Sequence, residues 1–242
     1  MPRLQRAPVI VVTGGAGVGK TTVAAVFRKL GARVLDVDRL ARRLLKPGEP
    51  AWREVLREFC GARSKTARTL PRRWRAEDFR DAAGCPLPEL PWAITPRGTI
   101  RRTKLGATVF AYPAALQALN RITHPRLRRL LEQAIRRHRR ESPRPLVLDM
   151  AVYPERPFRG LADAVLWVRA PEVLRQQRLT AHRRLTRAQA ADRVHNQWPD
   201  KHFQALADFI LPNRGSELEL RRRAQALWPA LKRHALGGAA HR

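Results

Sequence analysis

One glycine-rich segment constrains the fold of this 242-residue chain more than any other feature. Residues 14–21 read GGAGVGKT and satisfy the pattern G-x-x-x-x-G-K-[ST] in full. The apolar run Pro8–Thr13 predicts a buried parallel strand before the loop, and apolar residues at helical spacing over Thr21–Leu30 predict a helix after it. This strand–loop–helix context distinguishes a phosphate-binding loop from a chance glycine-rich turn.

The residue types of this loop suit phosphate chemistry. Glycines let backbone N–H groups turn toward phosphate oxygens without obstruction by a Cβ atom. The following helix presents its positive end to the same phosphates. Lys20 can reach the β- and γ-phosphates as a point charge, and the Thr21 hydroxyl can ligate Mg²⁺. The sequence therefore predicts a nucleoside-triphosphate site.

Two carboxylates follow a second short strand, predicted at Arg33–Leu35. Residues i and i+2 of extended backbone point the same way, so Asp36 and Asp38 could both face the phosphate loop. A carboxylate there can accept the proton of an attacking hydroxyl or hold metal-bound water. We favour Asp38 for the catalytic role, although it is also a good helix N-cap, which alone would explain it. Asp36 is the weaker candidate.

A third carboxylate ends a later apolar run. Leu146–Asp149 has the form of a Walker B strand, in which the terminal carboxylate meets Mg²⁺. Strand-terminal aspartates are also common turn formers. The metal-binding and the structural interpretations of Asp149 therefore carry equal weight.

Strands that alternate with helices predict an α/β fold, a P-loop NTPase-type parallel sheet flanked by helices. We expect a single domain over residues 8–231, with its core at 8–48 and 144–231. The last residues, 232–242, are expected to form a flexible tail.

A mainly helical subdomain is expected inside this domain, at residues 49–143, because the helical patterns there come without strands. Separate helices are predicted at Ala114–Ile122 and from His124-Pro125 to about Arg140. The Pro- and Arg-rich stretch at about 60–97 has no sustained period and predicts an irregular insertion.

The net charge of +29 suits nucleic acid, a membrane surface or an anionic substrate. Only 7 of the 49 cations are Lys, however, and the Arg residues are spread along the chain, which favours a compositional bias over a nucleic-acid surface. No apolar stretch of signal-peptide or membrane-spanning length follows the basic start. Cys60 and Cys85 form neither a disulfide framework nor a metal-ligand pattern. We therefore expect a cytoplasmic protein without a membrane partner, and nothing in the sequence indicates its oligomeric state.

Together these motifs resemble the dephospho-CoA kinase family. Residues 12–42 resemble that family's amino terminus without a gap, and the resemblance skips residues 60–97 and the tail. Shorter matches follow the family's spacing at Pro47–Ala51, Val109–Phe110, His124–Pro125, Asp149–Glu155, Arg178–Leu179, Leu185–Thr186, Arg193, Gln197, Lys201, Ala207–Asp208 and Asn213.

The resemblance implies transfer of the ATP γ-phosphate to the 3′-hydroxyl of dephospho-CoA, the last step of coenzyme A synthesis, with ATP and Mg²⁺. It also implies a helical substrate region and a helical lid. By this resemblance the catalytic residues are Lys20, Asp38 (the general base) and Arg183. The expected ATP-binding residues are Gly14, Gly15, Gly17, Val18, Gly19, Lys20, Thr21, Thr22 and Asn213. Substrate binding falls to Asp36, Arg102 and His124, and metal binding to Thr21 and Asp149.

The lid departs from the family's pattern. His182 and Arg183 stand where the family has an Arg-Asp pair. An arginine at the first position would neutralise charge that develops on the transferring phosphoryl group, a role that Arg183 or Arg184 would have to fill here. Two alternatives stay open: a P-loop kinase of another small acceptor, such as a nucleoside or nucleotide, and a catalytically weak or nucleic-acid-associated P-loop ATPase.

Overall fold

The computed structural model describes most of the chain, as two compact units. The first unit comprises the chain up to Asp38 and from Leu131 onward, and the second comprises Arg39–Leu130. The described residues are 6–60, 99–151, 153, 158–183, 185–195 and 197–237.

A five-stranded sheet forms the centre of the first unit, with all paired strands parallel in the order β2-β3-β1-β4-β5. All five residues of the central strand β1 are buried, as expected for a strand covered on both faces. The strands are β1 (Val9–Thr13), β2 (Arg33–Asp36), β3 (Leu146–Asp149), β4 (Ala164–Arg169) and β5 (Phe209–Pro212). The predicted α/β class is confirmed, and the segments that follow the strands meet at one edge of the sheet.

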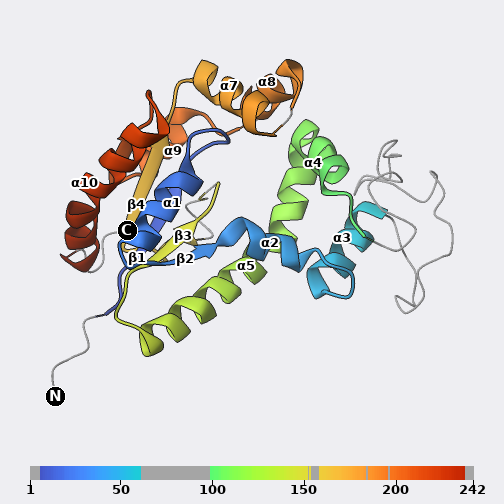
Figure 1. Cartoon of the computed structure of the whole chain (residues 1–242). Helices are drawn as coiled ribbons and strands as arrows, with labels where there is room; N and C mark the ends of the chain where they lie inside the picture. The colour runs from blue at the N-terminus through green and yellow to red at the C-terminus, as the bar shows by residue number, and fades with distance from the viewer. Residues whose placement is uncertain are drawn as a thin grey trace. The chain divides into compact units, whose positions relative to one another are not determined.

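Two helices that are far apart in the sequence cover one face of this sheet. Helices α1 (Lys20–Lys29) and α10 (Glu217–Gly237) lie side by side there (Figure 1). Phe27 of α1 stacks on Trp228 of α10 with ring centroids 4.5 Å apart, inside a core cluster shared with the strands. This packing holds the start of α1, and with it the phosphate loop, against the sheet.

The amino end of α10 is capped by the side chain of Ser216. The Ser216 hydroxyl accepts a hydrogen bond from the Glu219 backbone N–H at 3.2 Å. At its other end, α10 continues to Gly237, and Ala235 is buried in the core. The ordered helix therefore extends past residue 232, where the sequence placed the start of a tail.

Further helices lie between β4 and β5. Helices α7 (Glu172–Arg183) and α8 (Arg187–His195) form a hairpin with a small core of Leu179, Ala190 and Val194. The next helix, α9 (Asp200–Leu206), was not predicted because seven residues are too few to show a helical period. Phe203 of α9 stacks on Trp167 of β4 at 5.9 Å, so tertiary packing stabilises this short helix.

The second unit is mainly helical. It contains most of α2 (Val37–Leu44), together with α3 (Pro50–Cys60), α4 (Arg102–Ala111) and the first part of α5 (Pro113–Glu141). Arg126 of α5 forms an ion pair with Glu54 of α3. Among the described residues, no helix has both the length and the apolar character needed to cross a membrane.

Helix α5 corrects the prediction of two separate helices, because it runs through Pro125 without a break. A proline inside a helix removes one backbone hydrogen bond and usually kinks or ends the helix. Here buried residues on both sides of the proline, Ile122 and Leu127, keep the helix packed. The Arg126 side chain also donates to the Ile122 carbonyl at 2.6 Å. Burial therefore outweighs the local preference.

Candidate active site

The phosphate loop joins the end of β1 to the start of α1. Gly14, Gly17 and Gly19 have φ values of 138°, 77° and 100°, conformations that side chains disfavour. Gly19 lies at the N-cap of α1 in the left-handed conformation. The strand ends at Thr13 and the helix begins at Lys20, so the predicted strand–loop–helix context is confirmed.

Lys20 folds back over this loop from the first turn of α1. Its Nζ donates to the carbonyl oxygens of Gly14 at 2.5 Å and Gly15 at 2.9 Å. The positive charge therefore lies beside the backbone N–H groups and the positive end of α1. The helix start and the lysine together form a strongly electropositive position.

A cleft of about 520 Å³ adjoins the loop. Thr21 and Thr22 line it from α1, and Arg178 lines it from α7. The loop between β5 and α10 closes it with Asn213 and Gly215. A cleft of this size beside a phosphate loop has room for a nucleotide.

Asn213 is one of few buried polar side chains among the described residues, only 5% exposed. Its Nδ2 donates to the Val18 carbonyl at 2.8 Å, and its Oδ1 accepts from the Arg178 guanidinium at 3.2 Å. A Cβ atom on Gly19 would lie 2.7 Å from the Asn213 Nδ2. Asn213 thus fixes the phosphate loop through its hydrogen bond to Val18, and it also lines the cleft.

Three carboxylates gather at the same edge of the sheet. Asp149 pairs with Asp36 across β3 and β2, and with Val12 across β3 and β1. Burial raises the pKa of Asp149; the positive charge of Lys20 opposes this shift, and the charges of Asp38 and Asp36 reinforce it. Asp36, Asp38 and Asp149 therefore share one electrostatic site with Lys20.

The backbone at Asp38 differs from the expected one in two respects. Helix α2 begins at Val37, so Asp38 lies inside the first turn and not at the N-cap. Because β2 ends at Asp36, the two aspartates also do not share one extended strand, and the i, i+2 argument was wrong. The carboxylate of Asp38 instead accepts a hydrogen bond from the Ala151 backbone N–H, after β3, at 3.3 Å. The edge of the sheet, and not strand periodicity, brings these groups together.

Oxygen donors suited to Mg²⁺ are present at this edge. Among the described residues there is no group of three or more His, Cys, Asp or Glu placed to hold a metal. A magnesium ion bound with a nucleotide needs no such group, because phosphates and waters supply most of its ligands and the protein adds one or two oxygens. The Thr21 hydroxyl and the Asp149 carboxylate are donors of this kind.

The remaining predicted residues belong to other helices. Arg102 is exposed at the start of α4, and His124 is half-buried in α5; both belong to the second unit. Burial lowers the pKa of His124. Arg183 ends α7, but its side chain and that of His182 lie outside the described residues, as does Arg184 as a whole.

Three side chains that contact the phosphate loop were given no role from the sequence. Arg178 of α7 donates to the Gly17 carbonyl at 3.4 Å, and Arg175 of the same helix donates to the Ala16 carbonyl at 3.1 Å. Gln197, which follows α8, accepts from the Ala16 backbone N–H at 2.9 Å. The i, i+3 spacing of Arg175 and Arg178 places both on one helix face, and it could have indicated from the sequence that they act together.

Comparison with known proteins agrees with this geometry. The family model for dephospho-CoA kinase matches residues 8–82 and 91–219. The chain belongs to the dephospho-CoA kinase family. A dephospho-CoA kinase of Moorella thermoacetica is 31% identical over 227 residues, which cover 93% of each chain. One of Corynebacterium diphtheriae is 33% identical over 220 residues, covering 91% of this chain and 95% of the relative.

Solved structures support the fold of a dephospho-CoA kinase. A Thermus thermophilus protein of known structure is 28% identical, covers 93% of this chain and 97% of its own, and superposes with a TM-score of 0.66. The Campylobacter jejuni dephospho-CoA kinase is 19% identical over 93% of this chain and 97% of its own, with a TM-score of 0.56, and shares the fold.

The family match also corrects the extent of the resemblance. We expected it to skip residues 60–97, but the dephospho-CoA kinase model runs through residue 82 and resumes at residue 91. Residues 61–98 lie outside the described residues, so the structure does not describe most of this stretch.

Proposed function

We propose that this chain transfers the γ-phosphate of ATP to the 3′-hydroxyl of dephospho-CoA, producing ADP and coenzyme A. The observation that carries the proposal is the site at the edge of the sheet, where the charges of Lys20 and Asp38 both act on the Asp149 carboxyl group. Membership of the dephospho-CoA kinase family supports the choice of acceptor.

Asp38 acts as the general base in this proposal. Its carboxylate takes the proton of the acceptor hydroxyl, the hydroxyl oxygen forms a bond to the γ-phosphorus, and the bond to the ADP oxygen breaks. The hydrogen bond from the Ala151 N–H orients the Asp38 side chain for this step. Lys20 and the loop N–H groups stabilise the charge on the transferring group.

Thr21 and Asp149 would hold magnesium in this scheme. A bound ion would supply positive charge that neutralises the phosphates. Because the pKa of Asp149 is raised, more of this carboxylate is protonated at mildly acidic pH than an exposed aspartate would be. The affinity of the protein for magnesium with ATP should therefore weaken on acidification.

Further roles are assigned on the family resemblance. Asp36, Arg102 and His124 bind the acceptor, and Arg183 of the α7–α8 hairpin approaches the transferring phosphate. The pKa of His124, lowered by burial, favours a neutral imidazole at pH 7 that can accept or donate one hydrogen bond.

An acceptor panel with γ-labelled ATP tests the proposal. Dephospho-CoA should give the highest kcat/KM among dephospho-CoA, pantothenate derivatives, nucleosides and nucleotides, and the product should support a coenzyme A-dependent reaction. Lys20→Ala should abolish the transfer to dephospho-CoA and leave a folded protein, since Lys20 lies at the start of α1 and outside the hydrophobic core. Preferential phosphorylation of another acceptor, or hydrolysis stimulated only by nucleic acid, would reject the assignment.

A further inference from the structure

Two side chains of the α7–α8 hairpin bond both sides of one residue in the phosphate loop. The Ala16 N–H donates to the Gln197 Oε1 at 2.9 Å, and the Ala16 carbonyl accepts from the Arg175 Nε at 3.1 Å. The Arg175 guanidinium also donates to the same Gln197 oxygen. The three hydrogen bonds close a ring between Ala16, Arg175 and Gln197.

Gly15 lies next to this ring, and its backbone conformation does not by itself require glycine. Its φ lies outside the left-handed region that favours glycine, unlike that of Gly14, Gly17 and Gly19. A Cβ atom on Gly15 would overlap both the Gln197 Oε1 and the Arg175 guanidinium. The pair therefore occupies the space that a side chain at position 15 would need.

The hairpin backbone comes equally close to the loop. A Cβ atom on Gly17 would lie 2.7 Å from the Arg175 carbonyl oxygen. Arg175 lies in the first turn of α7 and Gln197 just beyond the end of α8, so both ends of the hairpin reach the loop. Arg175 is half-buried, and this burial lowers the pKa of its guanidinium.

We propose that Arg175 and Gln197 are positioning residues that brace the phosphate loop and set the orientation of the peptide between Gly15 and Ala16. This inference rests on the proposed function, because it takes residues 14–21 as the ATP site. The Ala16 N–H is committed to Gln197, so the brace leaves the later N–H groups of the loop to the phosphates. Without Gln197 this peptide can rotate and the loop loses its preorganised form.

Removing the acceptor oxygen tests the brace. Gln197→Ala should weaken ATP binding, measured by calorimetry without any acceptor, by about five- to thirtyfold, the worth of one or two hydrogen bonds. Gln197→Glu keeps an acceptor oxygen for the Ala16 N–H and for Arg175, and should restore most of the affinity. Gln176→Ala is the matched control, because the Gln176 amide bonds Glu172 one turn earlier on α7 and should leave ATP binding unchanged.

Amide exchange supplies a readout that needs no activity. The Ala16 N–H should exchange with solvent faster in Gln197→Ala than in the wild type and in Gln176→Ala, while the melting temperature reports whether each variant is folded. Unchanged ATP affinity together with unchanged exchange at Ala16 in a folded Gln197→Ala protein would overturn the brace.

The double-mutant cycle with Gly15→Ala isolates the steric part. Gly15→Ala should cost more ATP affinity in the wild type than in the Gln197→Ala background, because the overlap at Oε1 is then relieved. Additive costs would reject the explanation of Gly15. A protein that binds ATP and shows this coupling, yet does not phosphorylate dephospho-CoA, would retain the brace and lose only the proposed acceptor.

Discussion

Replacing Asp38 by Asn separates the chemical role of this residue from its structural one. Asparagine keeps an oxygen that can accept from the Ala151 N–H, so stability should change little. It cannot take a proton from the acceptor hydroxyl at neutral pH, so kcat should fall by about 10²–10⁴-fold while ATP affinity stays nearly intact. Steady-state kinetics and a melting curve check both parts. A destabilised variant with ordinary turnover would instead assign Asp38 a structural role, and Asp36→Asn in parallel would show whether its neighbour carries the chemistry.

Replacing Asp149 by Asn should raise the stability of the folded protein, whereas Asp38→Asn should change it little. A raised pKa means that the folded protein holds this proton more tightly than the unfolded chain does. The folded state is therefore favoured most at low pH, and that advantage is lost as the pH rises from the unfolded value, about 3.9, to the raised folded value. Asp149→Asn removes the loss, so without nucleotide or magnesium it should melt at a higher temperature than the wild type at pH 7.

Calorimetry across pH checks this prediction for Asp149. The difference in melting temperature between Asp149→Asn and the wild type should shrink as the pH falls, because the Asp149 carboxylate becomes protonated and is then uncharged, as the amide is at every pH. Phosphoryl transfer by the variant should be strongly reduced, because an amide is a poorer magnesium ligand than a carboxylate. A lower melting temperature at every pH would show that the electrostatic attraction of Lys20 outweighs the burial of Asp149.

At the scale of elements, helix α5 contains a proline that its packing tolerates. Pro125 is exposed and lies inside a helix of 29 residues. Pro125→Ala restores a backbone donor, so the free energy of unfolding should rise by about 1–3 kcal/mol. Urea titration measures this change. No gain would indicate that the helix is already bent around the proline in a way that alanine does not relieve.

The end of α7 offers a second test at this scale. His182→Arg places at this position the residue type that the dephospho-CoA kinase family has there. If neither Arg183 nor Arg184 already neutralises the transferring phosphate, turnover should rise about tenfold, which corresponds to about 1.4 kcal/mol in the activation free energy. Single-turnover kinetics separates chemistry from product release. An unchanged rate of the chemical step would assign the role to a neighbouring arginine.

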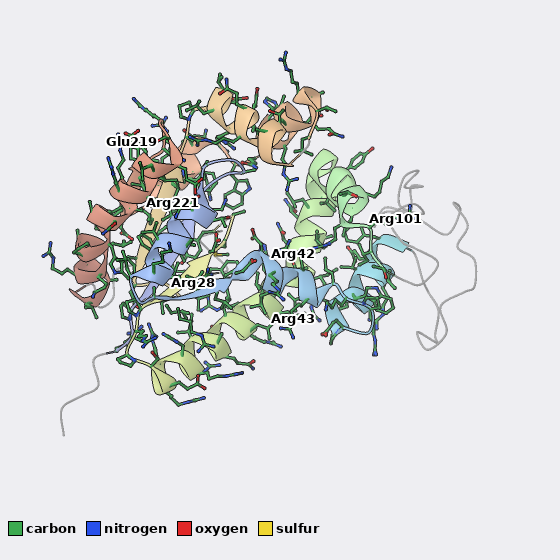
Figure 2. All side chains as sticks on the ribbon, viewed as in Figure 1. Arg28, Arg42, Arg43, Arg101, Glu219 and Arg221 are labelled. Carbon is green, nitrogen blue, oxygen red and sulfur yellow. The ribbon has the colours of Figure 1, made fainter. Side chains whose placement is uncertain are left out.

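At the scale of the whole molecule, the excess of positive charge is distributed over many elements. Arg28, Arg43 and Arg221 lie on α1, α2 and α10, respectively (Figure 2). Some of this charge is paired, since Arg221 donates to Glu217 one turn earlier on α10. Such a distribution matches the compositional bias that the sequence indicated.

Nucleic acid should therefore bind only weakly and without effect on turnover. Duplex DNA is expected to bind in the non-specific range, with a Kd of about 10⁻⁴–10⁻⁶ M at physiological salt, and to lose affinity steeply as salt is added. ATP consumption should be the same with and without DNA. Fluorescence anisotropy across a salt series and a coupled ATPase assay measure both. DNA-stimulated hydrolysis would contradict the expectation and favour a nucleic-acid-associated ATPase.

The sequence by itself determined the α/β class and the strand–loop–helix around residues 14–21. These features follow from local apolar periodicity and from a contiguous motif, and parallel strands necessarily bring their carboxyl ends together. Patterns of this kind can be recognised in a single sequence because they depend on residues that are close together along the chain.

Only the tertiary structure decided the continuity of α5, the place of Asp38 within α2 and the partners of the phosphate loop. Gln197 lies 181 residues from Ala16 along the chain, and no local period relates the two. Helix boundaries shift when burial outweighs propensity, as at Pro125, and a hydrogen bond across such a separation exists only after the sheet and the hairpin have packed. The physical reason is that the free energy of packing depends on which surfaces meet, and that is a property of the folded chain.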